Sequence, residues 1–160
     1  MGKKSDIISI ENVTYEEVKS FLLMEYGLKI QENQTCQVLG MHIDLQDLGY
    51  AYDYARDFLE KEALEEEHPF YKEVDMRNFN IVVDICTQPW RPCNDFMPII
   101  ADQMGRHISF KFKTKVVIAF ENGEIPFCMY DKGIKIKDLK EYYKDYLKGK
   151  AWQPTEIVGM

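Results

Sequence analysis

The stretch HISFKFKTKVVIAFENGEIPFCMYDKG, residues 107–133, constrains the fold more than any other part of the sequence. Apolar and polar side chains alternate over residues 108–113, and a period of two is typical of a strand with one buried face. The pair Asn122-Gly123 then separates two apolar runs, and Asn-Gly is the strongest short signal for a hairpin turn. We therefore expect antiparallel strands that form a C-terminal hairpin.

Two further segments predict strands. Residues 79–87, FNIVVDICT, are apolar through their centre, which is typical of a strand buried on both faces and therefore central in its sheet. Residues 36–45, CQVLGMHIDL, predict another strand, although Gly40 and Met41 weaken its alternation.

Two helices are predicted in the N-terminal half. Thr14 can cap the first, Glu17 stands at the capping-box position, and Gly27 supplies the stop. One face of this helix is expected to be apolar, with Val18, Phe21, Leu22 and Tyr26. Residues 47–67 place apolar side chains at spacings of three and four, which indicates a second, amphipathic helix.

Two more helices are predicted in the C-terminal half. Asn94 or Asp95 can cap a helix over residues 95–107, and residues 136–149 predict a closing helix. Mixed strands and helices with a terminal antiparallel meander favour the α+β class. We expect a central, mainly antiparallel sheet packed by about four helices.

The chain has the length of one ordinary domain, so we expect a single α+β domain over residues 1–160. Its first residues contain no apolar run of signal-peptide length, and nowhere do roughly 18 apolar residues follow one another. These features predict a cytoplasmic protein that does not insert into a membrane.

The cysteines and histidines do not form a recognisable site in the sequence. The four cysteines lack a C-x-x-C pair, and a reducing cytosol disfavours disulfides, so we expect buried or idle thiols. The three histidines lack the close paired spacing of zinc ligands. We predict no metal ion and no other cofactor.

Motifs that define an enzyme are absent from the sequence. It contains no Gly-x-Gly-x-x-Gly, no P-loop and no Gly-x-Ser-x-Gly, which excludes the enzyme classes that depend on them. A small enzyme or ligand-binding domain stays open as an alternative, with a pocket near Asp84, Cys86, Trp90 and His107.

Charge is distributed unevenly along the chain. Residues 1–80 hold eight Lys and Arg against seventeen Asp and Glu, whereas residues 81–160 hold twelve against ten. Residues 44–75 alone contain eleven acids and three bases. We call this segment the acidic window. This balance disfavours direct nucleic-acid binding, because such binding depends on Lys and Arg that displace counterions. It would speed the encounter with a basic protein.

Aromatic residues lie among these acids. The combination suits protein recognition, because aromatic side chains supply rigid contact area beside charges that attract Lys and Arg. Acidic clusters also serve solubility alone, and this alternative stays open. The candidate partner-binding residues are Asp53, Tyr54, Asp57, Glu60, Glu65, Glu66, Glu67, Phe70, Tyr71, Glu73, Asp75 and Trp90.

Four segments give the chain a family resemblance: the strand FNIVVDI, the helix PIIADQMGRH, the hairpin TKVVIAFENGEIPFCMYDKG and the acidic ARDFLEKEALEEEHPFYKEVD. Together they resemble immunity proteins of bacterial polymorphic-toxin and contact-dependent-inhibition systems. Those proteins are small, often acidic α+β domains without a catalytic site, and they block a cognate toxin that is frequently a basic nuclease.

The resemblance implies a non-catalytic inhibitor whose partner is a basic toxin domain. Carboxylates of residues 53–75 would pair with the Lys and Arg that the toxin uses for its substrate. The remaining alternative is an adaptor or regulatory domain whose acidic segment contacts another basic protein.

Overall fold

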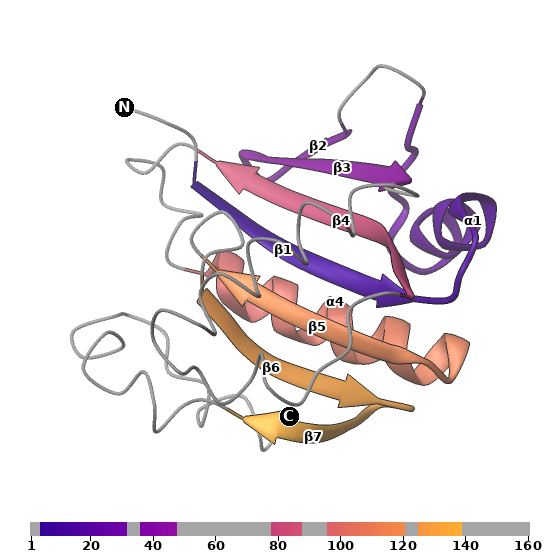
Figure 1. Cartoon of the computed structure of the whole chain (residues 1–160). Coiled ribbons are helices and arrows are strands. Elements are labelled where there is room, and N and C mark those ends of the chain that lie inside the picture. The colour runs from indigo at the N-terminus through magenta and orange to yellow at the C-terminus, as the bar shows by residue number, and fades with distance from the viewer. Residues whose placement is uncertain (1–3, 32–35, 48–77, 88–95, 121–124, 139–160) are drawn as a thin grey trace.

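The computed structural model describes residues 4–31, 36–47, 78–87, 96–120 and 125–138 (Figure 1). In chain order the elements are β1 (Lys4–Glu11), α1 (Tyr15–Tyr26), β2 (Cys36–Val38), β3 (Met41–Asp47), β4 (Phe79–Thr87), α4 (Met97–Phe112), β5 (Lys115–Phe120), β6 (Ile125–Asp131) and β7 (Ile134–Asp138).

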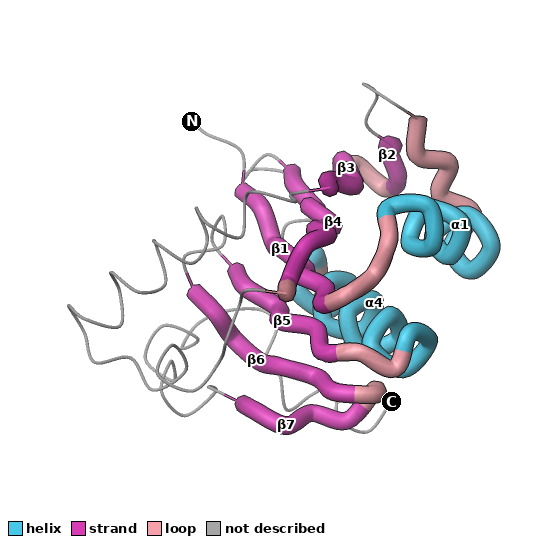
Figure 2. The backbone as a smooth tube through the Cα atoms, turned by 45° about the vertical axis from the view of Figure 1, so that its right-hand side comes forward, coloured by secondary structure: helices cyan, strands magenta, loops and turns pink. Residues whose placement is uncertain are grey.

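The described residues form an α+β fold around one antiparallel sheet. Its seven strands have the order β2-β3-β4-β1-β5-β6-β7, and every pairing between neighbours is antiparallel. Figure 2 shows α1 and α4 on the same side of this sheet. We call the side that they cover the helix face and the other side the opposite face. The expected fold class, the antiparallel sheet and the C-terminal hairpin are confirmed.

The number of helices differs from the prediction of about four, because the described residues form two. Most of the predicted segments 47–67 and 136–149 lies outside the described residues. Their described ends are strands instead: Asp47 ends β3, and residues 136–138 belong to β7.

The first helix follows its local sequence signals. Thr14 caps α1 by accepting a hydrogen bond from the Glu17 backbone N–H at 3.2 Å, and Gly27 ends it in the left-handed conformation at φ +66°. Val18 and Leu22 are fully buried against the sheet, which confirms the predicted apolar face.

The longest described helix corrects the predicted strand over residues 108–113. That stretch is helical as far as Phe112, and Phe96 rather than Asn94 or Asp95 occupies the cap position. The burial explains why: Ile108 is fully buried whereas Phe110 is 68% exposed, although alternation in a strand would put both on one face. The polar residues between Ile108, Phe110 and Phe112 give this part of the helix an alternating pattern that is also typical of a strand.

The close approach of α4 to the sheet depends on Gly105. A Cβ atom at this position would collide with Cδ1 of Ile118 on β5 and would lie 3.4 Å from Cγ1 of Val116. A glycine in a helix interior costs about 1 kcal/mol relative to alanine. Gly105 therefore allows α4 to pack closely against β5.

The centre of the sheet contains a strand that the sequence analysis did not predict. β1 lies between β4 and β5, with Ile8 opposite both Val83 and Ile118. β4 lies between β1 and β3, as its apolar sequence predicts. The side chains of Ile8, Val83 and Ile118 are fully buried and form part of the core beneath the helices.

The predicted single strand over residues 36–45 is a hairpin. Leu39 and Gly40 both have positive φ, at 52° and 83°, as a two-residue turn between antiparallel strands requires. The interruption of the alternating pattern at Gly40 corresponds to this turn.

Candidate functional site

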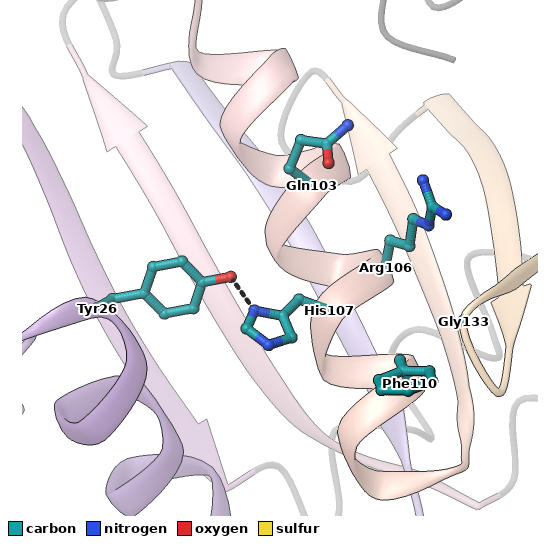
Figure 3. Close-up of a pocket in the computed structure, with 6 residues that line it drawn as sticks. All are labelled: Tyr26, Gln103, Arg106, His107, Phe110 and Gly133. Atoms are coloured by element: carbon teal, nitrogen blue, oxygen red, sulfur yellow. Dashed lines mark hydrogen bonds between the residues drawn. The ribbon is translucent and has the colours of Figure 1, made fainter. Parts of the chain in front are cut away.

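A groove open to solvent runs over the outer surface of α4. Its volume is about 390 Å³, and three elements line it: the end of α1, the exposed side of α4, and the turn between β6 and β7. The lining residues are Tyr26, Gln103, Arg106, His107, Phe110 and Gly133 (Figure 3). We call this site the α4 groove. The four residues from α4 recur at spacings of three and four, which places them on one side of the helix.

Tyr26 and His107 form the fixed part of the groove. The Tyr26 hydroxyl lies 2.8 Å from Nδ1 of His107, and this hydrogen bond joins α1 to α4 (Figure 3). Burial, with a smaller contribution from Glu25, raises the pKa of Tyr26 to about 12, so the phenol keeps its proton at neutral pH. When the phenol donates to Nδ1, a neutral imidazole carries its own proton on Nε2.

Aromatic packing supports this pair from the core side. The Phe21 ring meets the Tyr26 ring edge to face at 5.8 Å and the His107 ring at 4.9 Å, between centroids. Phe21 also packs against Phe112 at 5.6 Å and is itself 4% exposed. Edge-to-face pairs at such distances each contribute about 0.5–1.5 kcal/mol beyond burial. The orientation of Tyr26 and His107 is therefore set by packing.

The other end of the groove is formed by Phe110 and the β6–β7 turn. Gly133 has φ +82°, and a Cβ atom there would lie 2.8 Å from Cβ of Phe110. The backbone N–H of Gly133 donates to the Ser109 hydroxyl at 3.0 Å, and that hydroxyl donates to the Thr114 carbonyl at 2.7 Å. These contacts fix the turn against α4 and leave the Phe110 ring exposed.

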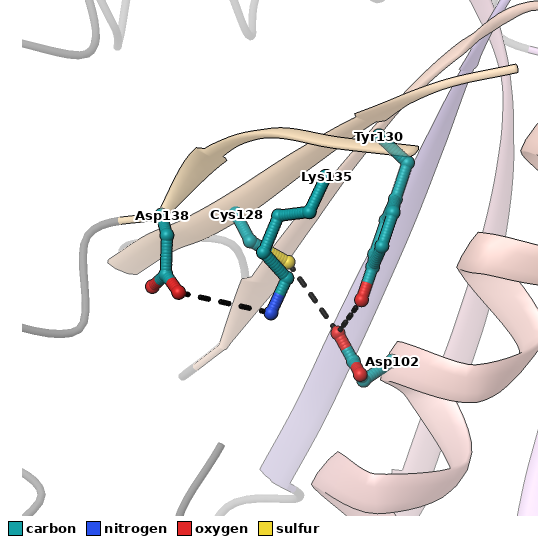
Figure 4. A network of polar contacts seen from close by, with 5 residues as sticks. All are labelled: Asp102, Cys128, Tyr130, Lys135 and Asp138. Carbon is teal, nitrogen blue, oxygen red and sulfur yellow. Dashed lines mark hydrogen bonds and ion pairs between the residues drawn. The ribbon is translucent and has the colours of Figure 1, made fainter. Parts of the chain in front are cut away.

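A second polar cluster lies inside the fold, between α4 and the C-terminal strands (Figure 4). Asp102 is 2% exposed, and its Oδ1 accepts hydrogen bonds from the Tyr130 hydroxyl at 2.8 Å and the Cys128 thiol at 3.4 Å. At the edge of the cluster, Nζ of Lys135 lies 3.8 Å from Oδ2 of Asp138 and 5.6 Å from the centroid of the Tyr130 ring.

Burial controls the protonation of this cluster. It raises the pKa of the Asp102 carboxyl, against the opposing effects of the Tyr130 hydrogen bond and the Lys135 charge. Burial also raises the pKa of the Cys128 thiol and of the Tyr130 phenol above their usual ranges. Both groups therefore remain protonated donors at neutral pH. Cys128 does not supply the thiolate that a nucleophile needs, so the cluster is structural.

Two acids meet on the opposite face of the sheet. Asp44 on β3 and Asp84 on β4 are register partners, and both are half-buried. Because Ile43 and Ile85 point into the core, alternation directs Asp44 and Asp84 away from the helices. Oδ2 of Asp44 accepts a hydrogen bond from Nε2 of Gln46 at 3.0 Å. Asp44, at the start of the acidic window, therefore lies opposite Asp84, which is 40 residues further along the chain.

The predicted partner-binding residues are not placed by the structure. All of them lie outside the described residues: Asp53, Tyr54, Asp57, Glu60, Glu65, Glu66, Glu67, Phe70, Tyr71, Glu73, Asp75 and Trp90. Their role stays a prediction.

The alternative pocket near Asp84, Cys86, Trp90 and His107 is not assembled as that hypothesis requires. Asp84 and Cys86 lie on the opposite face of the sheet, whereas His107 belongs to α4 on the helix face. Trp90 lies outside the described residues. The sheet itself separates the described members of this set.

The described residues offer neither a cluster of metal ligands nor a helix that could span a membrane. Within that part of the chain, no three His, Cys, Asp or Glu side chains gather so that they could hold a metal ion. Neither of the two described helices combines the length and the apolar character that crossing a membrane requires.

Sequence reasoning missed most of the α4 groove. It placed Tyr26 on the apolar face of the first helix, but this side chain is 38% exposed and bonds to His107, 81 residues further along the chain. The spacing of Gln103, Arg106, His107 and Phe110 was the available signal, but it was hidden by the strand prediction for residues 108–113.

Comparison with known proteins identifies no relative. The chain matches no protein-family model, no curated protein and no solved structure.

Proposed function

We propose that the protein is a non-catalytic inhibitor of the immunity-protein type, which neutralises a basic toxin domain by covering its substrate-binding surface. The toxin side would supply Lys and Arg, as a nuclease does to bind phosphates. The inhibitor would supply the carboxylates and aromatic side chains of residues 53–75.

The observation that carries this proposal is the convergence of Asp44 and Asp84 on the opposite face of the sheet. Two carboxylates at directly opposed positions concentrate negative charge there, although like charges opposite one another weaken an antiparallel pair. The acidic window, with eleven acids among residues 44–75, continues in the chain from β3, which carries Asp44. Negative charge is thus concentrated in the sequence of the acidic window, and Asp44 of this window lies opposite Asp84.

Occlusion follows from this chemistry. Charged pairs that are fully desolvated in an interface can couple by about 1.5–7 kcal/mol, whereas pairs at the rim contribute little. Phe70 and Tyr71 would then fill the cleft between the basic residues of the toxin, because aromatic anchors dominate such interfaces. Binding in this way needs no cofactor.

Co-expression with the toxin domain encoded by the neighbouring gene tests the proposal. The protein should restore growth of cells that produce this domain, and the two purified proteins should associate more slowly as salt increases. Replacing Glu60, Glu65, Glu66 and Asp75 by Lys should slow association by roughly tenfold or more.

A matched variant separates a specific surface from net charge. Replacing Glu16, Glu25, Glu141 and Glu156 by Lys makes the same change in net charge outside the acidic window. This variant should associate within about twofold of the wild type at physiological salt. The proposal is wrong if no neighbouring gene encodes a toxic domain, if growth is not restored, or if both variants lose affinity equally.

One further variant tests whether the opposite face of the sheet belongs to the same interface as the acidic window. Asp44→Lys should slow association as well, because its side chain lies on the same face as Asp84. Unchanged association of Asp44→Lys would limit the interface to residues 53–75.

A further inference from the structure

The α4 groove presents hydrogen-bond donors, and its six lining residues include no carboxylate. Arg106 contributes a guanidinium group, Gln103 an amide, and His107 an imidazole. Figure 3 shows the Arg106 side chain extending from α4 on the side away from Tyr26. A guanidinium group presents its donors in a planar fork that matches the two oxygens of a carboxylate. The polar part of the groove therefore suits an anionic group.

Apolar area lies directly beside these donors. Phe110 lines the groove and is 68% exposed. A single exposed apolar residue is ordinary, but the position of Phe110 is fixed by its close contact with Gly133 of the β6–β7 turn. The groove thus combines an anion-binding end with a rigid aromatic surface.

Positive charge lies in the groove lining and at the end of α4. Among the six lining residues, Arg106 carries a permanent charge. Lys111 and Lys113 lie at the C-terminal end of α4, where they offset the negative end of the helix dipole. Glu25, next to Tyr26, is the opposing charge at the α1 end.

We propose that the α4 groove binds an acidic peptide segment of a partner protein, with a carboxylate held by Arg106 and a neighbouring aromatic side chain packed against Phe110. The shape favours a peptide over a small molecule: sites for small ligands enclose most of the ligand surface, whereas this groove is open along α4. The charge of the lining selects an acidic segment over a basic one.

This site is separate from the surface assigned to the basic toxin. The groove lies over the helix face, whereas Asp44 and Asp84 point to the opposite face. The two partners have opposite charge, and each can bind without the other. Failure of either proposal therefore leaves the other standing.

Titration of the ¹⁵N-labelled full-length chain with the peptide Ac-EEFEE-NH2, followed by NMR, tests the site. The amide signals of Gln103, Arg106, His107, Phe110 and Gly133 should shift in a saturable way. The peptide Ac-QQFQQ-NH2 should bind at least about tenfold more weakly, because charge-assisted hydrogen bonds are roughly twice as strong as neutral ones. Sodium benzoate, as a free aromatic carboxylate, should also bind more weakly than the acidic peptide.

Two exposed positions on α4 provide the matched variants. Arg106→Gln should weaken binding of Ac-EEFEE-NH2 by about tenfold, because it removes a charge-assisted pair. Lys111→Gln removes the same charge from the same helix but lies outside the groove lining, so it should change affinity less than about twofold. Phe110→Ala should also weaken binding of the acidic peptide, because it removes the aromatic contact while leaving the carboxylate contact to Arg106 in place.

Several results would overturn the proposal. These are no saturable shift at millimolar peptide, shifts that map away from the groove, equal binding of the two peptides, or equal effects of Arg106→Gln and Lys111→Gln. Benzoate binding as tight as that of the acidic peptide would assign the groove to a small anion instead.

Discussion

Two tyrosines make hydrogen bonds of equal length to residues of α4, but their surroundings are different. The Tyr130 hydroxyl donates to Asp102 at 2.8 Å inside the core, and the Tyr26 hydroxyl lies 2.8 Å from Nδ1 of His107 in the α4 groove. Tyr130 is 3% exposed and Tyr26 is 38% exposed. The contribution of a hydrogen bond to stability depends on whether water can replace it, so the first pair should stabilise the fold and the second should serve the surface.

Tyr130→Phe should produce the largest effect on stability. It removes the strongest hydrogen bond of the buried Asp102 carboxyl while keeping the ring over which Lys135 lies. Leaving a buried polar group short of a partner costs about 1–3 kcal/mol. Urea denaturation at neutral pH should show this loss in the free energy of unfolding. A loss below about 0.5 kcal/mol would mean that water reaches Asp102.

Asp102→Asn tests the same pair through its pH dependence. The folded-state pKa of Asp102 is raised above the ordinary value of 3.8, so the folded protein holds this proton more tightly than the unfolded chain does. The stability that this group contributes is fully present below the ordinary value and is lost as the pH rises through the folded-state pKa. Asparagine does not titrate but can still accept from the Tyr130 hydroxyl.

The variant should therefore gain stability relative to the wild type as the pH rises. Urea denaturation at several pH values between about 4 and 7 measures the difference in the free energy of unfolding. A difference that stays constant over this range would show that Asp102 titrates in the folded protein as it does in the unfolded chain.

Tyr26→Phe should have the smallest effect on stability, below about 0.5 kcal/mol, because water can take the place of the hydroxyl at His107. Its effect should be on the groove, where it frees the imidazole ring. The ¹⁵N titration with Ac-EEFEE-NH2 should show weaker binding with unchanged unfolding in urea. If Tyr26→Phe destabilises the protein as much as Tyr130→Phe does, the contrast between the two tyrosines is wrong.

The sequence predicted elements whose signals are local. Thr14 and Gly27 mark the ends of α1 within a few residues of the bonds that they form, and Asn122-Gly123 marks the link between β5 and β6. The α+β class and the antiparallel sheet followed from such signals. The strand predicted for residues 108–113 failed because a short alternation cannot tell a buried Ile108 and an exposed Phe110 from two residues on one face.

The site could not be predicted because its contacts are long-range. Tyr26 and His107 are 81 residues apart, and Asp102 and Tyr130 are 28 apart, so only the packed fold brings them together. Asp44 and Asp84 likewise meet only through the register of β3 and β4. Periodicity shows which side of a helix or strand a residue occupies, but it does not show what lies opposite.

The position of β1 has a consequence for how the chain is made. Ile8 leaves the ribosome early, but its neighbours Val83 and Ile118 follow much later. At about 5–20 residues per second, this interval lasts several seconds, during which an apolar strand has neither of its partners. The pairing of β1 with β4 and β5 must therefore form late in synthesis, after all three strands have been made.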